Sequence, residues 1–276
     1  MIVDTHVHVV SADKVKHPLP PTASGWIREV SNPTEDYIKL MDAAGVDGAT
    51  LVQPGAMGPE NAYQADSGKR FAPRTVSVGI LDPVAPDAAD KLTYWIKERG
   101  MQGIRLMSQA EADDPRGDAL WKRAEALKVP VSLGGGGQPE KIDKMRNMLA
   151  RFPGVNAAPD HFAGWSGNKE QRAEMTKALA ALAALPNAYL RISNTSIGPY
   201  ASLDQADKDL FKRLIDAFTP RRVMWGSNFP ATREGGYTAQ VKLAQTALPF
   251  LSAEDRRWIL GDTAHKLWPS LRAPAK

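Results

Sequence analysis

Cysteine is absent from the 276-residue sequence, and this absence removes several kinds of chemistry. No disulfide framework, thiolate nucleophile or cysteine-based zinc site is available, and such a composition is typical of a reducing compartment. Long apolar runs are also missing, because none approaches the ~20 residues that a membrane helix requires. The first residues lack a basic region followed by an apolar stretch. We therefore expect no signal peptide, no membrane partner and a cytoplasmic location.

The sequence also lacks a strong charge of one sign. It has 35 Lys and Arg residues against 31 Asp and Glu residues, for a net charge of +4, and the two signs are interspersed. This pattern predicts a solvated surface with no basic stripe, so we expect no nucleic-acid partner. No linker, low-complexity tract or charge block marks a domain boundary, and we expect a single domain over residues 1–276. The oligomeric state stays open.

Strand-like and helix-like segments alternate along the whole chain. The predicted strands are 1–8, 48–53, 74–81, 103–106, 130–133, 155–158, 188–193 and 222–225. The predicted helices are 33–44, 60–70, 87–99, 118–127, 139–152, 170–185, 204–218, 237–248 and a segment from 253 onward. Eight strands, each followed by a helix, in about 250 residues is the count of an α/β fold of the (β/α)₈ TIM-barrel type.

An open, doubly wound sheet is the structural alternative to the barrel. Such a sheet places a glycine-rich phosphate loop directly between a strand and a helix. The four glycines at 134–137 do not give G-x-G-x-x-G with an acidic residue about 20 positions further on, so we favour the barrel. Asn32 is the expected N-cap of the first helix, with Pro33 at its first position. The long loop 11–30 before it is expected to cover a site.

His6 and His8 are the main chemical signal near the start of the chain. They are two of only five histidines. A strand has a side-chain period of two, so both imidazoles are expected on one face, with Asp4 below them. Two imidazoles side by side can bind one metal ion or hold one polarised oxygen. Two unrelated structural histidines are the alternative.

Polar residues stand at the expected carboxyl ends of several predicted strands. In a TIM barrel these ends form the active-site mouth, so side chains that are far apart in the sequence are expected to gather there. These residues are His6, His8, Gln53, Arg105, Asp160, His161, Arg191, Ser193 and Asn228. Tyr63 is a further candidate, although tyrosines more often have core or surface positions. His17 and His265 lie outside these positions, and we expect surface or packing roles for them. Trp26 could line a pocket, although packing is the more common role of a tryptophan.

Several motifs resemble those of the amidohydrolase superfamily. Three of them follow predicted strands one, six and eight: Asp4-Thr5-His6-Val7-His8, Pro159-Asp160-His161-Phe162 and Met224-Trp225-Gly226-Ser227-Asn228-Phe229-Pro230. Four others are similar to stretches of the branch that contains 2-pyrone-4,6-dicarboxylate lactonase and sugar lactonases: Leu51-Val52-Gln53-Pro54, Glu60-Asn61-Ala62-Tyr63, Gly103-Ile104-Arg105-Leu106 and Gly261-Asp262-Thr263-Ala264. Each motif is short, and their order on successive strands makes the resemblance specific.

The resemblance implies a hydrolase that opens a small lactone, one that carries carboxylates or hydroxyls, by attack of an activated water. It implies that His6, His8 and His161 polarise the ring carbonyl and hold the water. It also implies that Arg105 and Arg191 bind substrate carboxylates, because a guanidinium is a planar fork that cannot act as a base.

Other roles at the mouth stay open at this point. Gln53 and Tyr63 are further candidates for binding an anionic small-molecule substrate. The two arginines could instead pair with a buried acid, either Asp4 or Asp160.

The sequence departs from the superfamily pattern in two ways, which concern the metal ligands and the general base. Predicted strand five ends in Ser132-Leu133 and glycines, without the histidine of metal-dependent members. This resembles the metal-independent lactonase branch, so we expect no metal and no cofactor. Asn228 stands where the branch carries an aspartate base, and an amide cannot accept the proton, although it can orient a water. Asp160 or a histidine is then the candidate base. A metal-dependent decarboxylase and an inactive carboxylate-binding barrel are the alternative functions.

Overall fold

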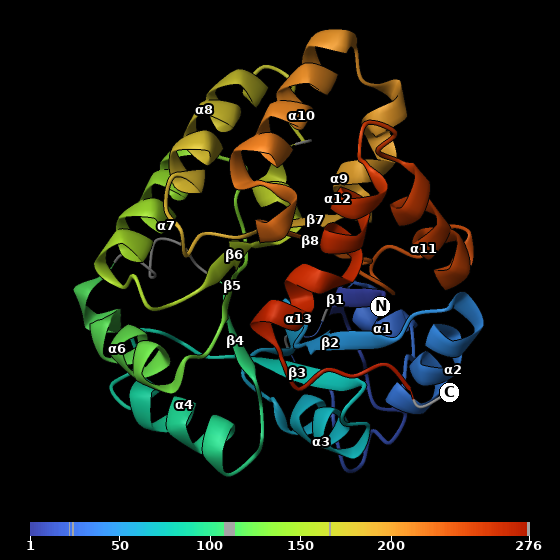
Figure 1. Cartoon of the computed structure of the whole chain (residues 1–276). Helices are drawn as coiled ribbons and strands as arrows, with labels where there is room; N and C mark the ends of the chain where they lie inside the picture. Colours follow the sequence, from blue (N-terminus) through green and yellow to red (C-terminus); the bar gives the residue numbers. More distant parts are fainter. Residues whose placement is uncertain (22, 24, 108–113, 166, 275–276) are drawn as a thin grey trace.

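Eight parallel strands form the centre of the computed structural model, which describes residues 1–21, 23, 25–107, 114–165 and 167–274 (Figure 1). The strands are β1 (Val3–Val7), β2 (Gly48–Val52), β3 (Thr75–Ile80), β4 (Gly103–Leu106), β5 (Val131–Leu133), β6 (Ala157–Pro159), β7 (Leu190–Ser193) and β8 (Val223–Gly226). Strands β1 to β6 pair in sequence order in one sheet, and β7 pairs with β8 in a second. The alternation of strands and helices therefore predicted the parallel order correctly.

Isolated bridges link the two sheets at both of their edges. Ala157 of β6 bridges to Ala188, just before β7, and Val7 of β1 bridges to Phe229, just after β8. The backbone N–H of Asn228 also donates to the carbonyl of His6 at 2.8 Å. The strands therefore follow one another around a curved sheet.

Helices flank the outer side of the strands (Figure 1). They are α1 (Trp26–Glu29), α2 (Thr34–Ala44), α3 (Ala62–Arg70), α4 (Ala88–Lys97), α6 (Asp118–Leu127), α7 (Pro139–Arg151), α8 (Arg172–Ala183), α9 (Asn194–Ile197), α10 (Gln205–Phe218), α11 (Gly236–Thr246), α12 (Ala253–Arg257) and α13 (Thr263–Leu267). A π-helical turn at Trp258–Asp262 joins the last two. Among the residues described, no helix is long and apolar enough to cross a membrane.

Helix α10 illustrates how sequence patterning builds this outer layer. Its buried apolar residues recur at helical spacing: Phe211, Leu214, Ile215 and Phe218. The Asp204 side chain caps its first turn by accepting the backbone N–H of Asp207. This apolar face packs beside α8, and Phe211 contacts the rings of Phe162 and Trp165 in the segment after β6.

Asn32 is not an N-cap, which corrects the expectation from the sequence. Helix α2 begins at Thr34 with Pro33 as its N-cap. The Asn32 amide instead donates to the carbonyl of His8 at 2.7 Å, and the hydroxyl of Tyr63 accepts the N–H of Thr34 at 3.0 Å. The Asn32 side chain is thus used in a tertiary contact with the end of β1, and the hydroxyl of Tyr63, in place of a local side chain, satisfies the N–H of Thr34.

Asp4 does not lie below the two histidines of β1. The pairing register of β1 with β2 shifts between Asp4 and Val7, which interrupts strict side-chain alternation. The Asp4 carboxylate accepts the N–H of Ser227 at 2.8 Å and the hydroxyls of Tyr37 and Tyr237 at 3.3 and 3.1 Å. Burial raises the pKa of Asp4. One buried carboxylate thus connects β1, the end of β8, α2 and α11.

We predict that Asp4→Ala lowers the free energy of unfolding by about 2–4 kcal/mol, because it leaves several buried donors without an acceptor. Urea unfolding followed by circular dichroism measures this loss. Asp36→Ala is the matched control, since Asp36 pairs with Lys39 on the surface, where the two side chains are 59% and 76% exposed. The control should change stability by less than about 1 kcal/mol. Equal stability of the two variants would contradict the structural role of Asp4.

Candidate active site

Three imidazoles meet at the carboxyl ends of β1 and β6. The ring of His6 lies 4.8 Å from that of His8 and 4.6 Å from that of His161, measured between centroids. His6 and His8 are buried, and His161 is half-buried. The structure therefore brings together the three histidines that the sequence singled out, with His6 in the middle.

Each imidazole has a different neighbour at its Nδ1 atom. His8 Nδ1 lies 2.8 Å from the carbonyl oxygen of Val52. A carbonyl only accepts, so His8 Nδ1 carries the proton and the Nε2 atom of the neutral ring has a lone pair. His161 Nδ1 lies 3.1 Å from Ser193 Oγ, which can donate or accept.

His6 is the exception, because neither of its ring nitrogens has a hydrogen-bond partner among the described residues. Its Nδ1 lies 3.5 Å from Asp160 Oδ1, an electrostatic contact longer than a good hydrogen bond. Buried polar atoms are rarely left without a partner. His6 is therefore the strongest candidate in the cluster for binding a substrate atom.

The three imidazoles are held neutral by their surroundings. Burial lowers the pKa of His6 well below its usual range, that of His8 to about 3 and that of His161 to about 4. The positive charge of Arg105 lowers all three further. Near pH 7 each ring therefore keeps a lone pair that can accept a proton.

Asp160 is a buried carboxylate held by two guanidinium groups. Arg105 Nε donates to Asp160 Oδ2 at 2.9 Å, and Arg191 donates to Oδ1. Burial alone would raise the pKa of Asp160, but the positive charges of Arg105 and Arg191 hold it well below its usual range. Asp160 therefore stays ionised, is a weak base, and suits the task of orienting His6.

The two arginines have further polar partners. Arg191 is almost fully buried, and it donates to Thr5 Oγ1 at 3.2 Å and to Ser132 Oγ at 2.9 Å. Arg105 donates to the carbonyl of Gln53 at 3.1 Å. Pairing with a buried acid was one of the two interpretations left open by the sequence, and Asp160 is that acid. Binding of a substrate carboxylate by either arginine stays a prediction.

Gln53 and Asn228 lie at the ends of β2 and β8, next to the cluster in the fold. The Gln53 amide donates to the carbonyls of Gly58 and Glu60, both at 3.0 Å. Its Oε1 is buried and has no partner among the described residues. Asn228 adopts a left-handed conformation with φ of 63°, and its side-chain amide donates to Thr232 Oγ1 at 3.1 Å. Its backbone, through the N–H bonded to His6, is what ties Asn228 to the cluster.

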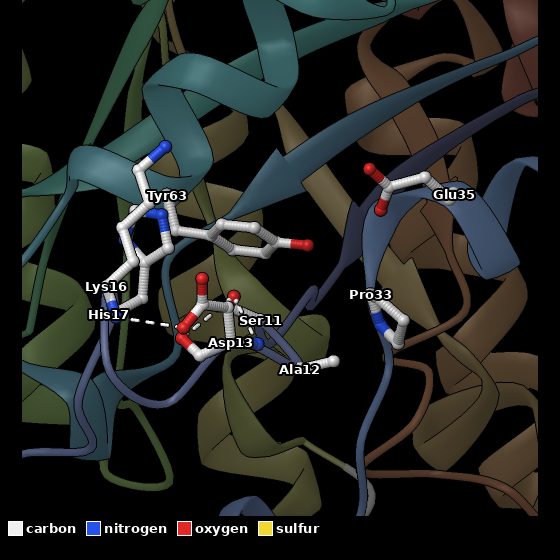
Figure 2. Close-up of a pocket in the computed structure, with 8 residues that line it drawn as sticks. All are labelled: Ser11, Ala12, Asp13, Lys16, His17, Pro33, Glu35 and Tyr63. Carbon is white, nitrogen blue, oxygen red and sulfur yellow. Dashed lines mark hydrogen bonds between the residues drawn. The ribbon is translucent and has the colours of Figure 1, made fainter.

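Tyr63 lies in a separate surface pocket of about 270 Å³. Figure 2 shows its ring between His17 and Glu35, and the two rings of His17 and Tyr63 are 5.1 Å apart. The lining residues are Ser11, Ala12, Asp13, Lys16, His17, Pro33, Glu35 and Tyr63. The structure thus gives Tyr63 a role in holding α2, and its predicted contact with substrate stays untested.

Trp26 and Ser193 also contact the cluster. From the sequence, Ser193 was expected at the mouth and Trp26 as a possible pocket residue, but neither was given a role in the chemistry. The Trp26 ring stacks on His8 at 5.6 Å with an interplanar angle of 26°. Trp26 also belongs to a small apolar cluster with Ile27 and Met57 that anchors the loop after β1 on the loop after β2. Periodicity could not reveal this contact, because α1 has only four residues. The position of Ser193 at the end of a predicted strand was the sequence signal that placed it near the site.

The arrangement of the described residues bears on whether the site could hold a divalent metal ion. Among them, no three histidine or acidic side chains are arranged as ligands of one ion. The charge of Asp160 is already balanced by two guanidinium groups, and the amide of Asn228 is a poor substitute for a carboxylate ligand. A dication beside two fixed cations is electrostatically unfavourable.

Histidines and an ion-paired aspartate thus lie together at the carboxyl ends of parallel strands in an α/β fold. The chain belongs to the amidohydrolase family, whose model matches residues 3–270. It is 27% identical to D-galactarolactone isomerase of Agrobacterium fabrum, over 92% of this chain and 86% of that protein. It is 26% identical to 4-sulfomuconolactone hydrolase of Hydrogenophaga intermedia, over 96% and 88%.

A solved structure from Pseudomonas putida has a similar fold. Its provisional name is 2-pyrone-4,6-dicarboxylic acid hydrolase. The TM-score is 0.75 at 21% identity, and the match covers 97% of both chains. The resemblance to the amidohydrolase superfamily that the sequence motifs indicated is therefore confirmed.

We predict that the free energy of unfolding falls as the pH is lowered from about 7 to 5. Histidines of the unfolded chain bind protons near pH 6.5, whereas His8 and His161 bind them only near pH 3 and 4 when folded. The unfolded state thus binds more protons in this window, and stability is lost with falling pH. Urea unfolding at several pH values measures the slope.

His8→Gln should reduce this slope, because it removes one of the depressed groups. His265→Gln is the matched control, since His265 is exposed on α13. An identical pH dependence in wild type and His8→Gln would show that burial of His8 does not depress its pKa.

Proposed function

We propose that the protein is a hydrolase that opens a small lactone at the carboxyl ends of its strands. The substrate carries carboxylates or hydroxyls. The observation that carries the proposal is His6, whose ring nitrogens have no hydrogen-bond partner in the described part of the chain and lie between two neutral imidazoles and beside an ion-paired aspartate. The names of the relatives, which concern lactones, support the same reaction class. The proposal includes a closed (β/α)₈ barrel as one domain over residues 1–276 and a cytoplasmic location.

His6 acts as the general base in this proposal. Its Nδ1 faces Asp160 and keeps the proton, because a carboxylate attracts an N–H, so Nε2 presents the lone pair. Nε2 takes a proton from the attacking water as the water oxygen bonds to the lactone carbonyl carbon. The ring C–O bond then breaks, and the same proton passes to the leaving alkoxide.

His161 and His8 hold the reacting groups on either side of His6. When Ser193 donates to His161 Nδ1, the Nε2–H of His161 is available to the developing oxyanion. His8 Nε2 carries a lone pair and accepts an O–H of the water, because its Nδ1–H is used by Val52. Asn228 holds the main chain of His6 and contributes to water orientation.

The charge balance of the site favours an anionic substrate. Two guanidiniums and one carboxylate in the Arg105–Asp160–Arg191 group leave one net positive charge, and the histidines are neutral. A buried net charge of this sign attracts a substrate carboxylate. Arg105 is slightly less buried than Arg191. In this proposal Arg105 therefore binds the substrate carboxylate directly, and Arg191 lies behind it. Gln53 Oε1 is the acceptor for a substrate hydroxyl, and Tyr63 lies further out.

We predict that His6→Asn lowers kcat/KM for lactone hydrolysis by about 10²–10⁴-fold, the range for loss of a general base. A panel of carboxylated and polyhydroxylated lactones, followed by proton release, gives the rates. His265→Asn is the control and should leave them unchanged. A wild-type protein that binds these lactones without opening any of them would favour the inactive carboxylate-binding alternative. Metal-stimulated loss of CO₂ from a hydroxybenzoate would favour the decarboxylase.

We also predict that the purified protein carries no stoichiometric metal and that activity survives a chelator. The physical reason is the absence, among the described residues, of an uncompensated carboxylate facing the histidines. Elemental analysis and assays with and without chelator test this. Asn228→Asp adds the missing carboxylate and should raise activity or create metal binding. About one zinc per chain in the wild type, with activity lost on chelation, would overturn the prediction.

A further inference from the structure

The segment that carries His161 has an unusual backbone. His161, Phe162 and Ala163 have φ values of 53°, 57° and 51°, all in the left-handed region, and Gly164 follows with φ of 76°. Side chains disfavour this region, and non-glycine residues normally visit it singly. Three in succession require a surrounding structure that imposes the conformation.

The glycines at 134–137, directly after β5, lie against this left-handed turn. A Cβ atom on Gly136 would stand 2.4 Å from the carbonyl oxygen of Ala163 and 2.6 Å from its carbonyl carbon. Gly137 N–H donates to the same carbonyl oxygen at 2.6 Å. On the other side, a Cβ on Gly164 would stand 2.9 Å from Gly137 N. Two main chains therefore touch with no space for a side chain between them.

Side chains fix the turn from its other faces. Phe162 is fully buried and packs on Phe211 and Trp165, with ring centroids 4.6 and 5.2 Å away. Ser193 Oγ holds the imidazole of His161 itself. The turn is thus held on one side by apolar packing around Phe162. On the other side it is held by the main chain of the glycine loop.

We infer that the glycine loop, residues 134–137, is a positioning device that holds the left-handed turn and so directs the imidazole of His161 toward His6. Gly136 is the central positioning residue and acts through His161 without touching substrate. The glycine run, which gave no phosphate-loop motif, thereby has a function. The inference rests on the proposed role of His161 in catalysis, but the positioning itself can be measured without any substrate.

Gly136→Ala is the test, read by NMR titration of the His161 imidazole in the full-length protein. In the wild type the pKa of His161 is about 4. If the added methyl group displaces the turn, the ring moves into solvent and its pKa rises by more than about 1 unit toward 6.5. With an active lactone, kcat should fall at least about 10-fold with KM changed by less than about 3-fold, as expected for misorientation.

Gly100→Ala is the matched control. Gly100 also has a positive φ, 74°, but nothing lies within 4 Å of an added Cβ. This variant therefore has the backbone strain of a side chain at positive φ, but its methyl group does not push two main chains apart as a wedge. It should leave the His161 titration unchanged. Gly164→Ala is a second, milder wedge between the same two main chains and should shift the titration in the same direction as Gly136→Ala.

An unchanged His161 titration in a folded Gly136→Ala or Gly164→Ala protein would overturn the inference. Loss of folding in both wedge variants, with Gly100→Ala folded, would also overturn it, because the contact would then be structural only. If the wedge variants shift the His161 titration but the wild-type protein opens no lactone, the inference about the glycine loop stands and the proposed function is refuted.

Discussion

A negative charge kept in the interior is the constraint on which the site depends. Asp160 stays ionised because Arg105 and Arg191 approach it from two different strands. Removing either guanidinium would break one buried ion pair and leave the Asp160 carboxylate with a single cationic partner, which is a costly change in a protein interior. The arginines in turn depend on Thr5, Ser132 and the carbonyl of Gln53. Five strands therefore converge on one carboxylate, and the direction of His6 follows from it.

The alternation of apolar strands and helices was sufficient to predict the order and type of most elements. The strand 103–106 and the helix 118–127 were predicted with the bounds that the structure has. These periodic patterns are local signals, because the spacing of apolar residues within one segment determines which of its faces is buried. The predicted strands placed His6, His8 and His161 at carboxyl ends that were expected to gather at one mouth, and the structure brings the three rings together.

The errors arise where distant residues override a local signal. Asn32 has the chemistry of an N-cap but bonds to His8, and Tyr63 caps the helix from 29 residues away. Asp4 left the predicted face because a register shift breaks the alternation of β1. The partner of Arg105 and Arg191 could only be narrowed to two acids, since the choice depends on how strands far apart in sequence meet. No periodic pattern in the sequence indicates any of these long-range contacts.

The contacts between β1 and the end of β8 have a consequence for the order in which the site is assembled. Thr5 donates to the carbonyl of Trp225 and Ser227 to Asp4, over separations of 220 and 223 residues. Loops of that length form slowly, because their closure entropy must be overcome before any contact is gained. On the ribosome, the strand that bears His6 and His8 is made long before β8 and waits for it. The contacts that hold the two strands together can form only after β8 has been made.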